Sequence, residues 1–277
     1  MDQPILVTGA TGHTGRHVVA GLLAENVPVR ALVRDPASAA LPAGVDVVVG
    51  DLTDADAVAR AAEGTAAAYL LWPGFDPTGA AATIAALAAR TPRIVYVSAS
   101  GAPEEPETVW GQVEAAVRSS AREWTFLRVT GLATNTLGWA EQVRSGVVRG
   151  PYGGATRSLV HERDVAATAV RALLDDGHDG HAYDVTGPEA LPQSEQARLI
   201  GEAIGRPVRW EEQPEAEARA QLTVEMGADF AEAGMAAWSA MVDAPEPVSS
   251  DVEKVTGRRA LTFAEWAREH ADDFSTA

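Results

Sequence analysis

The stretch ILVTGATGHTGRHVVAGLL, residues 5–23, decides the fold of this chain. Its apolar start is typical of a β-strand, and residues 14–24 have the apolar spacing of a helix. Between them, Gly9, Gly12 and Gly15 form the pattern G-x-x-G-x-x-G. Without side chains, such a turn can adopt positive φ, approach a phosphate closely and pack the helix on the strand. The helix N-terminus then offers free N–H groups to a pyrophosphate, so the segment predicts a dinucleotide site.

The kind of dinucleotide is indicated by the turn and by the end of the next strand. Thr11, His13 and Thr14 add side-chain donors to the turn. A tight turn without a ligand is the alternative, but the flanking strand and helix favour binding. In ALVRDP, Arg34 stands where an NAD site has a carboxylate, and its guanidinium suits a 2′-phosphate. We therefore expect NADP(H), with NAD(H) left open by the adjacent Asp35.

The adenine end of the predicted site follows the third strand. Asp51 in GDLTD is placed to accept a hydrogen bond from the adenine amino group, and Leu52 belongs to the same site. The alternative role for Asp51 is that of a helix N-cap, and the two roles are compatible.

The order of apolar segments predicts the fold class. Near-continuous Val, Ile and Leu runs are typical of strands covered on both faces, and helical segments alternate with them. This pattern predicts a Rossmann-type, doubly wound α/β fold with a parallel sheet. We expect a nucleotide-binding domain over 1–150 and a smaller, mainly helical lobe over 151–277, partly interleaved with it. The expected strands are residues 4–9, 27–34, 45–51, 66–72, 93–100 and 124–130.

Composition excludes several classes of function. The chain of 277 residues has no cysteine and a net charge of −17, which disfavours nucleic acid as a partner. No apolar run is long enough for a membrane span, so we expect a cytoplasmic protein without a membrane partner. The histidines of HDGH (178–181) lack further ligands nearby, so no metal is expected. Rossmann proteins often pair through helices, which leaves a homodimer open.

Five segments together resemble one family. TGATGHTG, ALVRDP, GDLTD, VYVSASG and HAYDVTGPEALPQSEQARLIGEAIGRPV are similar to the NmrA-like group of atypical short-chain dehydrogenases/reductases. The resemblance covers nearly the whole chain. That group includes NADPH:quinone reductases, relatives of isoflavone reductase and NADP-sensing transcriptional co-regulators.

The resemblance also implies roles for individual residues. Ser100 stands where related reductases keep a catalytic serine, and Asn135 would lie near the substrate pocket. Tyr152, in a Gly-rich loop, is a further candidate for the substrate site. The residues that would border the nicotinamide and its ribose are Leu71, Trp72, Pro73, Ser98 and Ala99.

The chain departs from the family in its catalytic pair. Most short-chain dehydrogenases use Tyr-x-x-x-Lys, whose lysine lowers the pKa of the phenol. Here Trp110-x-x-x-Glu114 occupies the place, and the single lysine is Lys254. Glu114 would donate a proton if burial raised its pKa, and Trp110 would stack on a flat substrate. The alternatives are a solvated glutamate and a packing tryptophan. His161, which resembles a position that ties a strand to a helix, is a second proton-donor candidate.

These features predict an NADPH-dependent reductase of a quinone or conjugated carbonyl, with a small, planar, apolar substrate. Such acceptors are electron-poor, so positioning against the nicotinamide supplies much of the acceleration. Ser100 would hydrogen-bond the developing oxyanion, and water, Glu114 or His161 would deliver the proton. The alternative is a non-catalytic NADP(H)-sensing regulator that binds a partner protein. A tailoring enzyme acting on a polycyclic aromatic is a third option.

Overall fold

The computed structural model describes residues 3–103 and 105–275, which divide into two compact units. The first unit comprises residues 1–129, 162–185 and 251–259, and the second comprises residues 130–161, 186–250 and 260–277. This division differs from the expected boundary at residue 150. The first continuous stretch ends at Val129, the last residue of a sheet strand, and later sequence returns to complete the same sheet.

The first unit contains a seven-stranded sheet in which every pairing is parallel, which confirms the predicted doubly wound α/β fold. The strand order is β3-β2-β1-β4-β5-β6-β9. The order reverses between β1 and β4, and open α/β sheets bind ligands at such a reversal. The strands are β1 (Ile5–Thr8), β2 (Val29–Val33), β3 (Asp46–Val49), β4 (Ala67–Leu70), β5 (Arg93–Ala99), β6 (Glu123–Val129) and β9 (His181–Val185).

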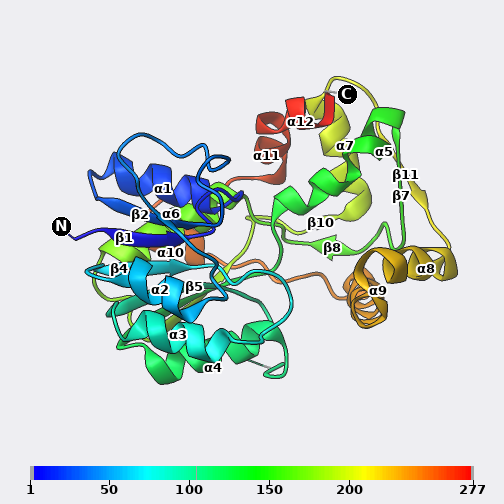
Figure 1. Cartoon of the computed structure of the whole chain (residues 1–277). Helices are drawn as coiled ribbons and strands as arrows, with labels where there is room; N and C mark the ends of the chain where they lie inside the picture. Colours follow the sequence, from blue (N-terminus) through cyan, green and yellow to red (C-terminus); the bar gives the residue numbers. More distant parts are fainter. Residues whose placement is uncertain (1–2, 104, 276–277) are drawn as a thin grey trace. The chain divides into compact units, whose positions relative to one another are not determined.

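Two groups of helices accompany this sheet (Figure 1). One group is α2 (Ala55–Ala62), α3 (Ala80–Ala88) and α4 (Val109–Ser120), which pack side by side in that order. The other is α1 (Gly15–Ala24), α6 (Glu162–Leu174) and α10 (Asp251–Thr256), with α6 between its neighbours. The apolar faces of α2, α3 and α4 and one face of the strands form a continuous core that includes Val58, Ile84, Val113 and Phe126.

The second unit is mainly helical and has two small sheets. Strand β7 pairs with β11 in parallel, and β8 pairs with β10 in antiparallel. Its core contains Ile200, Trp266 and Phe274. The elements are η1 (Ala133–Trp139, a 3₁₀-helix), α5 (Ala140–Ser145), β7 (Val147–Gly150), β8 (Thr156–Arg157), β10 (Leu191–Pro192), α7 (Gln193–Ala203), β11 (Arg209–Glu212), α8 (Glu215–Met226), α9 (Ala228–Asp243), α11 (Phe263–Glu269) and α12 (Ala271–Ser275).

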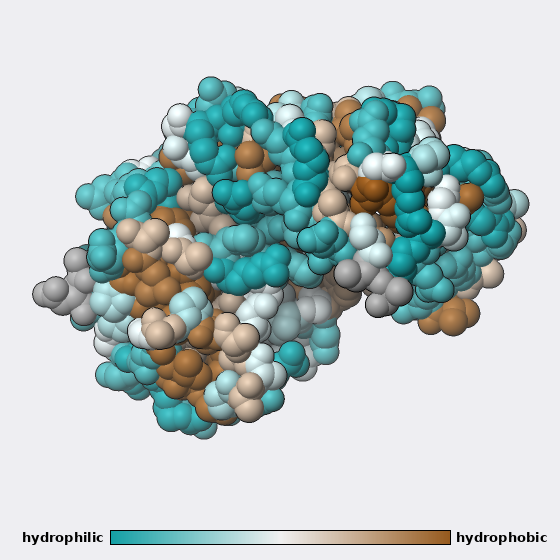
Figure 2. Space-filling view, turned by 90° about the horizontal axis from the view of Figure 1, so that it is seen from above, coloured by the Kyte–Doolittle hydropathy of each residue, from teal (hydrophilic) through white to brown (hydrophobic). Residues whose placement is uncertain are grey.

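The surface of the molecule is largely hydrophilic in the view of Figure 2, with hydrophobic residues gathered on part of the first unit. Among the described residues of this unit, the exposed large hydrophobic side chains are Val47, Val49 and Phe75. Within the described residues, no helix combines the length and apolar character needed to cross a bilayer.

Candidate functional site

The glycine turn after β1 is too tight for any residue with a side chain at its last position. Gly9 has a φ of +63°, and the N–H of Gly12 donates to the Gly9 carbonyl oxygen at 3.0 Å. A Cβ placed on Gly15 would lie 2.0 Å from that same oxygen. Only glycine therefore allows α1 to begin this close to the strand end.

The same turn leaves a row of donors available for an anion. Among the described residues, the backbone N–H groups of Thr11, His13 and Thr14 make no hydrogen bond. Thr11 and His13 are exposed, whereas Thr14 is buried and directly precedes α1. Free N–H groups and the positive end of the helix dipole form an anion site, so the turn fits the pyrophosphate of a dinucleotide.

The turn lies where the strand order reverses, and a threonine joins the two strands there. The Thr8 hydroxyl donates to the Tyr69 carbonyl at 3.1 Å and accepts from the Leu71 N–H at 2.9 Å. The Leu71 side chain lies against the glycine turn, 3.4 Å from where a Cβ on Gly9 would be. Leu71 thus borders the proposed cofactor site.

The two residues after Leu71 differ in exposure. Trp72 is buried, and its indole N–H donates to the Asp76 carbonyl at 2.9 Å. Pro73 is exposed. Trp72 therefore holds the loop after β4, and Leu71 and Pro73 are the members of this trio with accessible surface.

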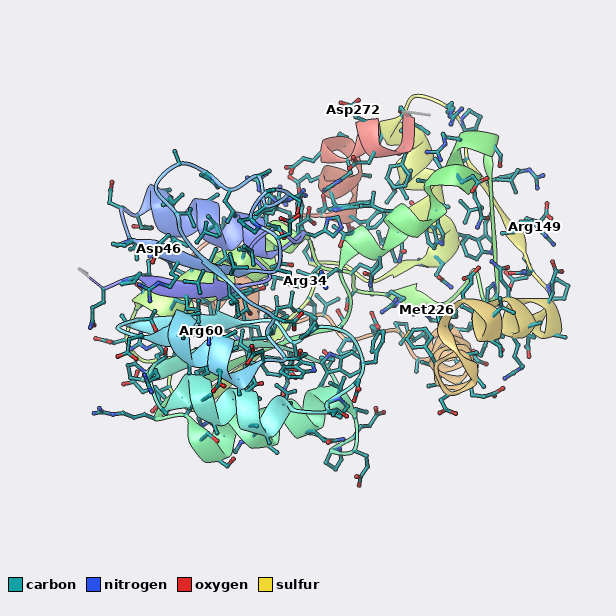
Figure 3. All side chains as sticks on the ribbon, in the orientation of Figure 1. Arg34, Asp46, Arg60, Arg149, Met226 and Asp272 are labelled. Atoms are coloured by element: carbon teal, nitrogen blue, oxygen red, sulfur yellow. The ribbon has the colours of Figure 1, made fainter. Side chains whose placement is uncertain are left out.

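Charged groups follow the ends of β2 and β3. Arg34 is exposed directly after β2 (Figure 3). Asp35 is engaged locally, because its Oδ1 accepts the Ala37 N–H at 2.9 Å. Asp51 Oδ1 accepts both the N–H and the hydroxyl of Thr53 at 2.8 Å. These bonds hold the pKa of the Asp51 carboxyl below its ordinary value, and the positive charge of Arg34 lowers it further.

The alternative role of Asp51 as a helix N-cap is wrong. The N-cap of α2 is Asp54, whose Oδ1 accepts from the N–H groups of Asp56 and Ala57. Leu52 is buried and belongs to the core beneath α2. Asp51 is therefore free of a capping role and stays a candidate for the adenine site.

Two serines lie at the carboxyl end of β5 in different environments. Ser98 is 1 % exposed, and its hydroxyl has no hydrogen-bond partner among the described residues. Ala99 is half-buried. Ser100 is exposed, and its N–H donates to the Val129 carbonyl at 3.0 Å. A ligand can therefore reach the Ser100 hydroxyl, whereas that of Ser98 is enclosed.

Glu114 is neither solvated nor isolated. Its side chain is 3 % exposed, and both carboxylate oxygens accept from Arg128, with Nε to Oε1 at 2.9 Å and Nη2 to Oε2 at 2.8 Å. Arg118 adds a contact at 3.4 Å. The alternative of a solvated glutamate is thus wrong. Both oxygens are engaged by arginines and the side chain is almost fully buried, so this geometry supports a structural ion pair rather than a proton donor that reaches a substrate.

Trp110 forms an aromatic pair with Phe75, a residue that the sequence analysis did not single out. It is half-buried against the core, and its ring packs edge-to-face on Phe75 with centroids 5.7 Å apart. Phe75 is 57 % exposed. A signal was available, because Phe75 follows Trp72-Pro73-Gly74 directly in the loop after β4. The pair presents an aromatic edge to solvent.

The tyrosines and the lysine of the first unit are either buried or bonded to other residues. Tyr69 and Tyr96 are buried, which raises the pKa of both phenols and keeps them protonated. The Tyr183 hydroxyl bonds to His178 Nδ1 at 2.8 Å. Lys254 pairs with Asp251 at 2.8 Å. No phenol–ammonium relay exists in the part of this unit that the structure describes.

The remaining sequence-predicted residues lie in the second unit. Asn135 is exposed on η1. Tyr152 has a φ of +55°, and its N–H donates to the Glu212 carboxylate. His161 is buried, with Nε2 at 3.3 Å from the carboxylate of Glu269. These three residues therefore have separate local environments.

A cavity of about 320 Å³ lies within the second unit. Asn135 lines it, and so does Trp238, one of the residues of the Ala-, Met- and Trp-rich region 213–244. Met235 from that region is buried, whereas Met226 is exposed (Figure 3). Residues of one sequence region thus lie in three different environments: Met235 in the interior, Trp238 at the cavity and Met226 on the surface.

Comparisons with known proteins agree with this geometry. The NAD(P)H-binding family model matches residues 9–176. The (4-alkanoyl-5-oxo-2,5-dihydrofuran-3-yl)methyl phosphate reductase of Streptomyces griseus is 41% identical, with 98% of this chain and 99% of that protein covered. The NAD(P)H azoreductase of Xenophilus azovorans is 36% identical, with 99% and 100% covered.

A solved structure is similar over nearly the whole length of the chain. The NADPH-dependent quinone oxidoreductase QOR2 from Escherichia coli, complexed with NADPH, has a TM-score of 0.82 and 26% identity, with 96% of this chain and 99% of that chain covered. The glycine turn, its free N–H groups and these matches agree. The chain belongs to the NAD(P)H-binding family, in the NmrA-like group of atypical short-chain dehydrogenases/reductases, and is an NAD(P)H-dependent oxidoreductase.

Proposed function

We propose that the protein is an NADPH-dependent reductase of quinones and other conjugated carbonyl compounds with planar, largely apolar skeletons. The observation that carries the proposal is the pairing of a complete dinucleotide turn with Trp110 and an ion-paired Glu114 where a Tyr–Lys relay would stand. A reaction that needs little proton transfer from the protein fits this combination.

The preference for NADPH rests on charge at the end of β2. Arg34 is exposed there, and it is a bidentate donor suited to a 2′-phosphate. Asp35, the residue that left NAD open, accepts the Ala37 N–H with its Oδ1. This bond ties the Asp35 side chain to its own turn, which supports Arg34 as the residue that meets the 2′-phosphate.

The chemistry needs few protein groups. The reduced nicotinamide supplies a hydride to an electron-poor carbon. Ser100 donates a hydrogen bond to the oxygen that gains charge, and water supplies the proton. Glu114 holds Arg128 and with it the end of β6, and Trp110 with Phe75 offers an aromatic surface to a flat substrate. His161 remains the candidate proton donor of the second unit.

The relatives support the substrate class. By their names, one acts on a methyl phosphate whose 5-oxo-2,5-dihydrofuran ring carries an alkanoyl group, one on azo compounds and one on quinones. These acceptors share a conjugated, electron-poor double bond. That shared feature favours conjugated carbonyl compounds over isolated ketones for this chain.

The test is a steady-state assay of NADPH oxidation with benzoquinones, naphthoquinones, enones and saturated ketones. We expect turnover with quinones and enones and none with saturated ketones, or with secondary alcohols plus NADP. A preference for secondary alcohols would overturn the proposal. Tight binding of NADPH without any turnover would instead support an NADP(H)-sensing regulator.

A further inference from the structure

We propose that the cavity of the second unit is a binding site for an uncharged aromatic ring that carries hydroxyl donors, such as a dihydroxynaphthalene. Its volume of about 320 Å³ is large enough for a two-ring compound.

Two glutamines from α7 line the cavity with their donor groups already used. Gln193 Nε2 donates to the carbonyls of Pro151 and Tyr152 at 3.2 and 3.1 Å. Gln196 Nε2 donates to the Leu191 carbonyl at 3.0 Å. Because the partners are carbonyl oxygens, the nitrogen end of each amide must face them. The acceptor ends of both side chains are left for another partner.

A third glutamine is oriented by a relay that ends in a carboxylate. Gln213 Nε2 donates to Gln221 Oε1 at 3.1 Å, and Gln221 Nε2 donates to Glu225 Oε1 at 2.8 Å. The carboxylate accepts only, so the direction of the whole relay is set. The carbonyl oxygen of Gln213 is therefore the atom of this side chain that still needs a hydrogen-bond donor.

The three carbonyl oxygens are accessible although their residues are buried. Gln193, Gln196 and Gln213 are 7 %, 1 % and 6 % exposed. Their Oε1 atoms accept no hydrogen bond from any described residue. None of these three atoms is fully enclosed, so each keeps some accessible surface. All three residues line the cavity. The cavity therefore presents acceptors, and a ligand that satisfies them must bring donors.

Indole rings supply the apolar walls. Trp139 and Trp210 pack edge-to-face with centroids 5.6 Å apart, and Trp238 lines the same cavity. Trp210 is held in place, because its Nε1 donates to Glu212 Oε2 at 3.0 Å and a Cβ on Gly150 would lie 2.8 Å from its ring. Fixed indole faces favour a flat ring, and their orientation costs no further entropy on binding.

The two arginines that line the cavity are paired with carboxylates. Arg157 lines it, but both Nε and Nη2 contact Glu246 Oε1, at 3.3 and 3.2 Å. Arg149 pairs with Glu211 at 2.9 Å and with Glu217 at 3.3 Å. An anionic ligand would meet three amide carbonyl oxygens and no uncompensated cation. The site therefore favours a neutral ligand and disfavours a phosphate ester or carboxylate.

The test measures binding by calorimetry on the full chain without NADPH, so its outcome is separate from that of the turnover assay. Four probes share the naphthalene ring: a dihydroxynaphthalene, its dimethyl ether, naphthoquinone and naphthyl phosphate. We expect the diol to bind about tenfold or more tightly than the ether, the quinone and the phosphate, since one lost hydrogen bond changes affinity by about that factor. Equal or tighter binding of the ether or the phosphate, or no binding of the diol, would overturn the proposal.

Two variants locate the binding. Gln213→Met removes one acceptor at the cavity and should weaken the diol about tenfold while leaving the affinity for the ether unchanged. Gln112→Met is the matched control, because Gln112 is a helical glutamine of the first unit whose Nε2 donates to the Glu107 carbonyl. Diol binding that is unchanged in a folded Gln213→Met protein, or weakened equally by both variants, would contradict the assignment. If Gln213→Met does not fold, the four-probe series on the natural chain decides.

Discussion

Arg128 presents the fork of its guanidinium to both carboxylate oxygens of Glu114, at 2.8 and 2.9 Å. Glu114 comes from α4 and Arg128 from the end of β6, where Arg128 is paired in register with Ser98 of β5. The ion pair thus joins a helix to the carboxyl edge of the sheet, next to the predicted nicotinamide site.

Replacement of Glu114 by Gln should therefore destabilise the protein. Arg128 would keep its position, with a side chain only 18% exposed, but would lose its counter-charge. Breaking a largely buried pair in this way costs about 3 kcal/mol. Urea unfolding measures this cost. Glu123→Gln, which breaks the more exposed pair with Arg93, is the control and should cost about 1 kcal/mol or less. Equal losses in the two variants would contradict a special role for Glu114.

Replacement of Arg34 by Ala should change the preference between cofactors. Loss of a charge-assisted contact to the 2′-phosphate should raise the KM for NADPH about tenfold or more and leave the KM for NADH unchanged. Steady-state kinetics with the same quinone measures both. Arg60→Ala is matched in charge, since Arg60 is exposed on α2 (Figure 3). A parallel rise for NADPH and NADH would argue against contact with the 2′-phosphate.

Replacement of Gly15 by Ala should impair both folding and cofactor binding. The new Cβ would meet the Gly9 carbonyl oxygen at 2.0 Å, so the turn or α1 must move. Overpacking of this kind costs about 1–3 kcal/mol. We expect the upper end of this range, because the new Cβ would meet backbone atoms of Gly9 and Ala10, which cannot rotate away as a side chain can. Thermal unfolding and NADPH titration are the measurements. At Gly138 a Cβ meets nothing within 4 Å, so Gly138→Ala should change neither. An unaltered NADPH affinity in Gly15→Ala would count against the turn as the binding site.

His178 should make the protein less stable in mild acid. Burial lowers the pKa of His178 in the folded protein, so the unfolded chain binds the proton more readily. Its contribution is complete above the ordinary histidine pKa of about 6.5 and is lost as the pH falls through the lowered pKa of the folded state. His178→Asn, which keeps a polar side chain beside Tyr183 but removes the titrating ring, should flatten the dependence of melting temperature on pH below about 6.5. His13→Asn, at an exposed position, is the control, and an identical slope in all three proteins would refute the prediction.

Much of the first unit could be predicted because its signals are local. Gly9, Gly12 and Gly15 stand between a strand and a helix, and buried parallel strands are recognisable as apolar runs. In the second unit, the capping box of Thr262 and Glu265 is a local signal of the same kind, since it needs only neighbours along the chain. The contact of Leu71 with the glycine turn is a tertiary contact that no local pattern predicted.

The sequence by itself determined the parallel sheet, the glycine turn and the absence of a Tyr–Lys pair, because each depends on residue type and short-range spacing. Only the tertiary structure decided that Glu114 is paired with Arg128, that Ser98 is enclosed while Ser100 is exposed, and that Gln193, Gln196 and Gln213 line one cavity. Those facts depend on residues far apart in the chain, and burial and hydrogen-bond partners are set only when distant segments pack together.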